Sequence, residues 1–306
     1  MPRGPQIRLG TRASALARWQ AEWVRARLEE RGVDVVLVPI TTGGDREQAP
    51  IRAGSDRGVF TREIQQALLD GRVDLAVHSL KDLPTEQIEG LALAAVPPRA
   101  SVADVLVGAR GGSLEELPDR AIVGTGSLRR RAQIGHIRPD LQMRDLRGNV
   151  DTRLRKLASG DYDAIVLAEA GLRRLGLDVH ITHVLPLATV LPAPGQGALG
   201  LEIRLDDDRA RRAIEALDDP LAHAAVVAER AMLTALQGGC LAPIAAWGRF
   251  EGDRLVLTGR VLSPDGAEKV DATATGTRDQ AAALGRRLAT ELIGQGAAEL
   301  IARSRA

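Results

Sequence analysis

The stretch AIVGTGSLRRRAQIGH, residues 121–136, contains the pattern that decides the fold. Apolar Ala121–Gly124 predicts a short buried strand, Thr125-Gly126-Ser127 a tight turn, and Leu128–His136 a helix. Ser127, directly before the helix, is a favourable N-cap residue. The stretch therefore predicts a strand that passes through a small-residue turn straight into a helix.

The same order of elements continues on both sides of this stretch. Downstream, we expect a strand over Leu141–Leu146, a helix over Val150–Ala158, a strand over Tyr162–Ala168 and a short helix over Ala170–Leu175. Upstream, the pattern predicts strands over Ile7–Gly10, Val33–Ile40, Val73–Ser79 and Leu91–Val96, and helices over Ser14–Arg31 and Phe60–Asp70. Alternation of this kind predicts two α/β domains with largely parallel sheets.

The last third of the chain has a different pattern. The segment 187–205, with its prolines and glycines, predicts a return crossing followed by one more strand. A helix over Pro220–Leu236 is followed by strands over Ile244–Phe250, Arg254–Leu262 and Glu268–Thr275 and by a helix over Arg278–Ile293. Turn residues between these strands indicate hairpins, and this part is predicted to be a small α+β domain.

The composition limits the possible classes of protein. A chain of 306 residues is too long for one small core and predicts two or three domains. Because 41 Lys and Arg residues nearly balance 40 Asp and Glu residues, the net charge of +1 favours neither nucleic acid nor a membrane surface as partner. Aromatic residues are only 2%, so stacking platforms for single-stranded nucleic acid or flavin are not expected.

Cysteine content and hydropathy indicate the compartment. The one cysteine, Cys240, excludes an internal disulfide and a cysteine-based metal site. The N-terminus has no apolar signal-peptide core, and no run reaches the roughly 18 apolar residues of a membrane span. We therefore expect a soluble, cytoplasmic protein.

Two segments place hydroxyl and arginine side chains between a strand and a helix. Thr11-Arg12-Ala13-Ser14 follows the first predicted strand, and the turn with Thr125, Ser127, Arg129 and Arg130 occupies the equivalent place in the second half. Helix N-termini favour anions, and the planar arginine fork suits carboxylate or phosphate. Simple helix capping explains either segment alone. Two such segments on matched elements favour anion binding in a cleft between domains.

Further arginines belong to the middle of the chain. Arg147 and Arg153 bracket another strand-to-helix junction, and Arg174 ends the short helix after the next strand. Solvated helix faces are the alternative interpretation for such residues. Strand ends, however, line ligand crevices in open α/β sheets, which favours a binding role.

The segment from Val77 to Asp82 passes from an apolar strand into charged residues. A carboxylate at the end of a strand, near arginines, can stabilise a cation that forms during a reaction. A Lys81–Asp82 surface turn stopped by Pro84 is an equally good interpretation of the local sequence. His78 is interpreted as a hydrogen-bonded structural residue rather than a base.

Cys240 follows a predicted helix and the pair Gly238-Gly239. The glycines permit an exposed loop and the close approach of a ligand. A lone cysteine is more often an inert buried residue, which is the alternative. A thiol that serves as a permanent attachment point needs no partner base.

Eight segments together resemble the porphobilinogen deaminase family, also called hydroxymethylbilane synthase. They are TRASALA at 11–17, RGVFTREI at 57–64, AVHSLKDLPT at 76–85, GTGSLRRRAQ at 124–133, DLRGNVDTRL at 145–154, LAEAGLRRLGL at 167–177, APGQGALGLE at 193–202 and ERAMLTALQGGCLAPI at 229–244. Each motif alone has modest specificity, but eight in the family's order run through nearly the whole chain.

The resemblance implies three domains and an enzyme activity. Residues 1–98 with 193–216 would form α/β domain 1, residues 99–192 α/β domain 2, and residues 217–306 a small α+β domain 3. The first two would be type II periplasmic-binding-protein-like lobes. Members of the family join four porphobilinogen molecules with loss of ammonia and release hydroxymethylbilane by hydrolysis. The resemblance also implies a monomer that needs no nucleic acid, membrane or metal.

The resemblance also implies roles for single residues. Cys240 matches the cysteine that carries a covalent dipyrromethane cofactor, and Asp82 matches the catalytic aspartate. Other positions that match cofactor-binding residues are Ser79, Lys81, Thr125, Ser127, Arg129 and Arg130, together with Asp82. Positions that match substrate-binding residues are Arg12, Ser14, Arg147, Arg153, Arg174 and Gln196.

Two departures and one rival class accompany the resemblance. One departure is that a cleft lysine of the family falls near Ala53 or Gly54 here, so that contact is expected to be missing. Arg57 stands where the family usually has a lysine, so the charge is kept but the geometry is not guaranteed. A two-lobed solute receptor that binds anions without catalysis would also fit the paired α/β domains. Such a receptor leaves Cys240 and the third domain unexplained.

Overall fold

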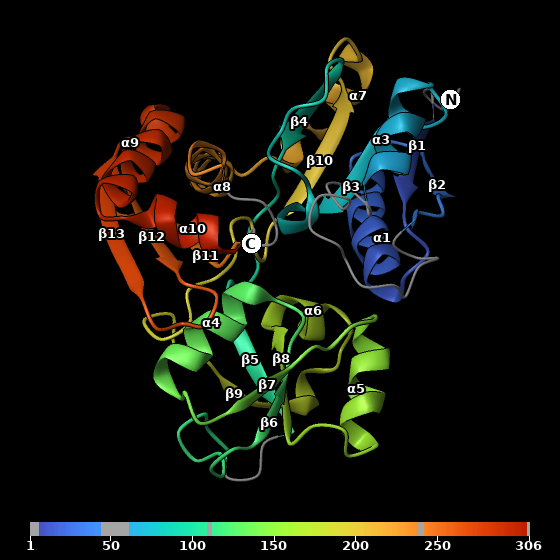
Figure 1. Ribbon diagram of the computed structural model, residues 1–306. Helices are drawn as coiled ribbons and strands as arrows, with labels where there is room; N and C mark the ends of the chain where they lie inside the picture. The colour runs from blue at the N-terminus through green and yellow to red at the C-terminus, as the bar shows by residue number, and fades with distance from the viewer. Residues whose placement is uncertain (1–5, 44–60, 109–111, 238–241, 305–306) are drawn as a thin grey trace. The chain divides into compact units, whose positions relative to one another are not determined.

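The computed structural model describes residues 6–43, 61–108, 112–237 and 242–304. The chain divides into two compact units, residues 1–100 with 198–223 and residues 101–197 with 224–306. The first unit contains one β-sheet and the second contains two (Figure 1).

The sheet of the first unit has five strands in the order β2-β1-β3-β10-β4. Their bounds are β1 Ile7–Thr11, β2 Val35–Pro39, β3 Leu75–Ser79, β4 Leu91–Ala95 and β10 Leu199–Arg204, and the helices of this unit include α1 Ala15–Glu29, α3 Arg62–Leu69 and α7 Asp208–Ile214. Strand β1 is parallel to β2 and β3, whereas β10 is antiparallel to β3 and β4. Fully buried Leu9, Leu28 and Leu75 join the sheet to α1 in one core, and each such side chain contributes about 1.5–3 kcal/mol.

The first sheet of the second unit has the order β7-β6-β8-β5-β9. The bounds are β5 Asp104–Val107, β6 Ile122–Gly124, β7 Gln142–Arg144, β8 Ala164–Ala168 and β9 Ile181–Val184, with helices α4 Leu128–Ile137, α5 Val150–Ala158 and α6 Glu169–Arg174. Strand β6 is parallel to β7 and β8, whereas β5 is antiparallel to β8 and β9.

The two five-stranded sheets have the same topology. In each, three parallel strands lie in the order second, first, third, and a single antiparallel strand separates them from the fourth. In each sheet, the antiparallel strand is distant in sequence from the strand beside it. Strand β10 comes after all strands of the second unit's first sheet, and β5 comes after the strands β1–β4 of the first unit. This order confirms the predicted fold class, which is two type II periplasmic-binding-protein-like α/β lobes followed by a small α+β domain.

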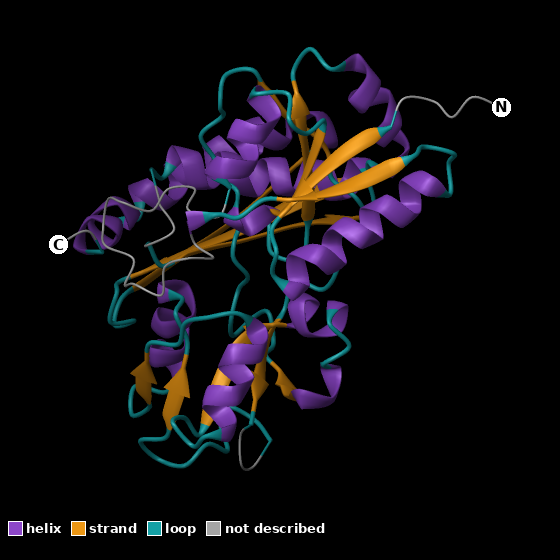
Figure 2. Cartoon of the chain, turned by 90° about the vertical axis from the view of Figure 1, so that its right-hand side faces the viewer, coloured by secondary structure: helices purple, strands orange, loops and turns teal. Residues whose placement is uncertain are grey.

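The C-terminal part is the predicted α+β domain. Its three-stranded antiparallel sheet consists of β11 Ile244–Glu251, β12 Arg254–Leu262 and β13 Lys269–Gly276, in that order. Helix α8 Pro220–Ala235 precedes these strands in the chain, and helices α9 Ala281–Gly294 and α10 Ala297–Arg303 follow them (Figure 1). Figure 2 shows the helices and strands of the chain coloured by type. Met232, Leu257 and Leu288 join α8, the sheet and α9 in one buried cluster.

Four elements were not predicted from the sequence: β5, β9, α7 and α10. Strand β5 is four residues long and buried throughout, so it shows neither alternation nor helical periodicity. The helix expected from Arg278 begins at Ala281, because Arg278–Gln280 form a 3-10 turn. In the described part of the chain, no helix is long and apolar enough to cross a membrane.

Candidate active site

The first group of candidate residues lies at the carboxyl edge of the first unit's sheet. Parallel strands β1 and β3 end at Thr11 and Ser79, so Arg12, Ser14 and Asp82 follow the same edge. Ser14 is the N-cap of α1, and its hydroxyl accepts a hydrogen bond from the Ala17 amide at 3.4 Å. The structure therefore brings these residues to one edge, and Ser14 performs the capping that the sequence left as an alternative.

Ser79 is held by a helix as well as by its strand. Gln20, a buried residue of α1, donates from Nε2 to Ser79 Oγ at 2.7 Å. One residue earlier, buried His78 Nε2 lies 3.0 Å from Glu202 Oε2, and Gln65 Nε2 donates to Glu202 Oε1 at 3.0 Å. His78 is thus a hydrogen-bonded structural histidine, as predicted, and these side chains fix the end of β3.

Asp82 is exposed and stands on a short, anchored turn. Leu80–Asp82 form a 3-10 turn in which Leu80 N donates to Ala198 O at 3.0 Å and Leu83 N donates to Leu80 O at 3.2 Å. Leu80 and Leu83 are buried on either side of half-buried Lys81 and of Asp82. An accessible carboxylate in a fixed position is suited to stabilising a positive charge on a bound ligand.

The second group lies at the carboxyl edge of the first sheet in the second unit. Strand β6 ends at Gly124, and Thr125 is buried directly after it. The Thr125 hydroxyl accepts from Ser127 N at 3.2 Å, and Ser127 Oγ, the N-cap of α4, accepts from Arg130 N at 3.5 Å. The predicted strand, turn and helix are confirmed here.

Arg129 and Arg130 are buried and share one carboxylate. Arg129 Nη2 lies 2.8 Å from Asp104 Oδ2, and Arg130 Nη2 lies 2.7 Å from Asp104 Oδ1. Burial by itself raises the pKa of Asp104, but the charges of the two guanidinium groups and the hydrogen bonds from Arg130 and Gln196 outweigh it and hold that pKa well below its usual range. Burial lowers the pKa of Arg129, and Asp104 offsets part of this shift.

Asp104 is the residue that the sequence analysis missed. Its one visible signal is an acidic residue at the head of the apolar run VLV, residues 105–107. Gln196, predicted at the substrate site, also contacts Asp104, since its Nε2 donates to Asp104 Oδ1 at 2.9 Å. Three predicted site residues therefore meet on a side chain that was not among them.

The remaining arginines have separate surroundings. Arg147 Nε donates to Asp145 Oδ2 at 2.8 Å, and Arg153 Nε donates to Gly148 O at 2.8 Å, both next to the end of β7. Arg174 Nη2 donates to Gly197 O at 2.7 Å, and burial lowers the pKa of Arg174 to about 10. Each of these three hydrogen bonds has an acceptor other than Asp104, the carboxylate that Arg129 and Arg130 share.

Three predicted features lie outside the described residues. Cys240 falls between α8 and β11, and both Arg57 and the position near Ala53 or Gly54 precede α3. Within the described ranges, no group of three or more His, Cys, Asp or Glu side chains is arranged to hold a metal ion.

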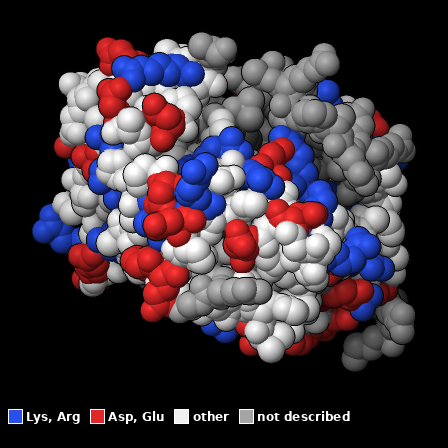
Figure 3. Space-filling view, turned by 60° about the horizontal axis from the view of Figure 1, so that its bottom comes forward, with Lys and Arg blue, Asp and Glu red and all other residues white. Residues whose placement is uncertain are grey.

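The surface charge is mixed. Lys and Arg side chains are interspersed with Asp and Glu on the face that Figure 3 shows, which agrees with the balanced composition.

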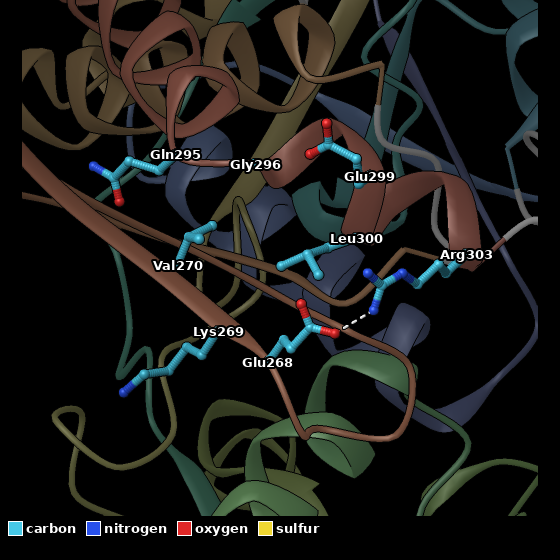
Figure 4. Close-up of a pocket in the computed structure, with 8 residues that line it drawn as sticks. All are labelled: Glu268, Lys269, Val270, Gln295, Gly296, Glu299, Leu300 and Arg303. Atoms are coloured by element: carbon cyan, nitrogen blue, oxygen red, sulfur yellow. Dashed lines mark hydrogen bonds and ion pairs between the residues drawn. The ribbon is translucent and has the colours of Figure 1, made fainter.

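A cavity of about 450 Å³ lies in the C-terminal part, where α9 and α10 meet the start of β13 (Figure 4). Its lining consists of Glu268, Lys269, Val270, Gln295, Gly296, Glu299, Leu300 and Arg303. The ion pair between Arg303 and Glu268 crosses one side of it. None of the predicted site residues lines this cavity.

Comparison with known proteins decides the family. Residues 7–212 match the family model "Porphobilinogen deaminase, dipyromethane cofactor binding domain", and residues 223–294 match "Porphobilinogen deaminase, C-terminal domain". The chain belongs to the porphobilinogen deaminase family.

Full-length relatives agree with this assignment. A porphobilinogen deaminase from Pelotomaculum thermopropionicum is 49% identical over 304 residues, which cover 98% of this chain and 97% of the relative. One from Desulforudis audaxviator is 50% identical over 305 residues, which cover 98% of both chains. The resemblance stated from eight motifs is thus confirmed along the whole chain, and the family is that of an enzyme rather than of a solute receptor.

Solved structures similar to this chain include nutrient-binding proteins. A nutrient-binding protein from Burkholderia cenocepacia bound to methionine has a TM-score of 0.45 and 14% identity, and the match covers 70% of this chain and 92% of that one. A methionine-binding lipoprotein from Bacillus subtilis, described as putative, has a TM-score of 0.43 and 12% identity over 69% of this chain and 89% of that one.

Proposed function

We propose that this protein joins four porphobilinogen molecules with loss of ammonia and then releases hydroxymethylbilane by hydrolysis, as a step in tetrapyrrole biosynthesis. The observation that carries the proposal is family membership across 98% of the chain, with Asp82 kept on an anchored turn at a sheet edge. We further propose that the protein acts as a cytoplasmic monomer with three domains, at the boundaries predicted from the sequence. Its partner is a small-molecule substrate rather than nucleic acid or a membrane.

The proposed cofactor is one dipyrromethane per chain, attached covalently to Cys240. A pyrrole of this kind bears acetate and propionate groups, and the described residues fit such a group. Buried Arg129 and Arg130 have Asp104 as their one acidic partner among the described residues, and Arg129 Nε makes no hydrogen bond there. When bound, the dipyrromethane would supply the pyrrole carbon to which the first substrate is joined. Residues proposed to hold it are Ser79, Lys81, Asp82, Thr125, Ser127, Arg129 and Arg130.

Asp82 is the proposed catalytic residue. When ammonia leaves porphobilinogen, the pyrrole that remains carries positive charge, and an ionised carboxylate nearby lowers the energy of that state. Asp82 is exposed, so it can reach the pyrrole nitrogens of a bound ring. Its turn is anchored by buried Leu80, so little reorganisation is needed when charge develops.

The proposed substrate-binding residues are Arg12, Ser14, Arg147, Arg153, Arg174 and Gln196. Each new ring adds an acetate and a propionate, so negative charge accumulates as the chain grows. Arginine forks bind carboxylates through paired, charge-assisted hydrogen bonds. The position of Arg12 and Arg147 just beyond parallel strand ends supports this role.

The test of the proposed function is turnover of porphobilinogen by the purified protein. We expect release of ammonia and formation of hydroxymethylbilane, together with a positive Ehrlich colour reaction from protein-bound dipyrromethane. A solute receptor would bind porphobilinogen without consuming it and would give no colour after dialysis. That outcome would refute the proposal.

The arginines are expected to divide into two classes when each is replaced by leucine. Arg129→Leu and Arg130→Leu remove buried, cofactor-holding forks, so the purified chain should lack the added mass of the cofactor and should be less stable. Arg12→Leu and Arg147→Leu should keep the cofactor, and Arg147→Leu should accumulate bound pyrrole intermediates. Intact-mass spectra after brief exposure to porphobilinogen measure the number of rings.

The matched control is Arg155→Leu, an exposed arginine on α5 away from the junction. It should carry the cofactor and elongate normally. Normal loading and elongation in all four test variants would mean that these arginines bind no ligand.

A further inference from the structure

Asp104 is a fully buried acidic residue at the edge of the second unit's first sheet. It is the first residue of β5, it is 0% exposed, and it pairs in register with Ala168, the last residue of β8. Its carbonyl accepts from Leu185 N at 2.9 Å, and the neighbouring Ala103 carbonyl accepts from Glu169 N at 3.1 Å. Because β5 is antiparallel to β8, its first residue lies at the carboxyl edge of the parallel strands.

The two oxygens of Asp104 have different partners. Oδ1 accepts from Arg130 Nε at 3.0 Å, from Arg130 Nη2 at 2.7 Å and from Gln196 Nε2 at 2.9 Å. Oδ2 faces Arg129 Nη2 at 2.8 Å. The far ends of the guanidinium groups are fixed by main-chain carbonyls, since Arg129 Nη1 donates to Leu191 O at 2.5 Å and Arg130 Nη1 to Val166 O at 3.0 Å. The carboxylate and these main-chain carbonyls together set the orientation of both arginine planes, and Gln196 Nε2 is held by the carboxylate and by Val102 O, to which it donates at 2.7 Å.

We propose that Asp104 is the positioning residue of the cofactor site, which holds Arg129, Arg130 and Gln196 in the arrangement that receives the carboxylates of the dipyrromethane. This inference rests on the proposed function, because it is the family's cofactor that the arginine pair would bind. Asp104 itself carries the same charge as the cofactor's carboxylates, so it acts through the arginines and not by contact with the ligand.

The net charge of the buried group explains why two arginines are paired with only one carboxylate. Among the described residues, Asp104 is the only acidic side chain that forms an ion pair with either guanidinium, so the buried group carries a net charge of about +1. A buried charge without a counter-ion is costly, and an incoming carboxylate lowers that cost. Arg129 Nε, buried and without a hydrogen bond among the described residues, is a donor that such an anion can use. A second buried acidic residue would orient the pair equally well but would remove its attraction for the cofactor.

Asp104→Asn is the most informative substitution, because it preserves volume and removes charge. The amide oxygen of Asn can still accept hydrogen bonds from Arg130 and Gln196. The amide nitrogen would then face Arg129 Nη2, so two hydrogen-bond donors would point at each other. We expect the folded variant to carry cofactor at about one-tenth of the wild-type level or less, since the ion pair between Asp104 Oδ2 and Arg129 Nη2 is replaced by a contact between two donors. The fraction of folded chains with added mass, measured after size-exclusion chromatography, is the readout.

The matched control is Asp140→Asn. Asp140 accepts from Arg138 Nε and Nη2, each at 2.7 Å, in the same unit, but its side chain is 33% exposed. This variant should carry the full added mass. If neither the wild type nor Asp140→Asn carries the mass, the proposed cofactor is wrong, independently of Asp104.

A purely structural role would lower stability without changing the mass of the folded fraction. Folded Asp104→Asn protein with full cofactor loading would therefore overturn the proposal. If Asp104→Asn does not fold, Asp104→Glu decides, because it keeps the charge but moves it by one methylene. Reduced loading in folded Asp104→Glu protein supports positioning, whereas full loading, or failure of both variants to fold, assigns Asp104 to folding alone and overturns it.

Discussion

Cys240→Ser protein is expected to have neither the cofactor nor the activity. Cys240 is the only cysteine of the chain, so no other thiol can form the thioether. The wild-type protein should exceed its 32.6 kDa chain mass by one dipyrromethane, and the variant should have the unmodified mass. Intact-mass spectrometry and the rate of hydroxymethylbilane formation measure the two effects.

The same variant should also be less stable to heat. A ligand that binds only the folded state stabilises that state, so loss of the dipyrromethane lowers the melting temperature. Wild-type protein measured in the same buffer is the reference, and the Ehrlich reaction reports the cofactor independently. An active Cys240→Ser enzyme with unmodified mass would contradict covalent attachment at this residue.

Asp82→Asn is expected to lower turnover by about a hundredfold or more while cofactor loading persists. The estimate follows from the effect of removing one preorganised electrostatic group that stabilises developing charge. Asparagine has the same size, and the turn is anchored by Leu80 and Leu83 rather than by Asp82, so the backbone should not move. Substrate affinity should therefore change much less than kcat. Steady-state kinetics with porphobilinogen separate the effect on kcat from the effect on substrate affinity, and the intact mass shows whether the cofactor is present.

Glu89→Gln provides the matched control for Asp82→Asn. Glu89 is exposed in the same connection between β3 and β4, and its loss of charge should leave kcat unchanged. Near-normal turnover in Asp82→Asn would make Asp82 an ordinary turn residue, the alternative that the local sequence left open.

The candidate site could be predicted in part, and the limit has a structural cause. Ser14 and Ser127 were identified because a helix cap is a local feature. Both hydroxyls accept a hydrogen bond from a backbone amide in the first turn of the helix, as expected for an N-cap. Asp104 could not be identified in this way. Its hydrogen bonds join residues 26 and 92 positions apart in the sequence, and no local pattern encodes such a pairing.

The structure also changes how Arg129 and Arg130 are understood. At the sequence level they are two of several arginines near strand ends, with solvated helix faces as the alternative. Their burial excludes that alternative, whereas Arg147 remains about one-third exposed beside Asp145. The difference arises because Arg129 and Arg130 of α4 are buried against Asp104 of β5, a long-range contact that the sequence of the turn does not reveal.

The sequence by itself determined the alternation of strands and helices, the small C-terminal α+β domain and the family. These follow from spacings of two to four residues and from short motifs, which are local. The return crossing that leads to β10 was predicted, but only the tertiary structure decided that β5 is a strand and that β5 and β10 each lie antiparallel in a sheet of otherwise distant segments. That position of β5 places Asp104 at the strand edge beside Arg129 and Arg130. The pairing is stable because a buried carboxylate requires buried cations, and only the completed sheet brings them within hydrogen-bonding distance.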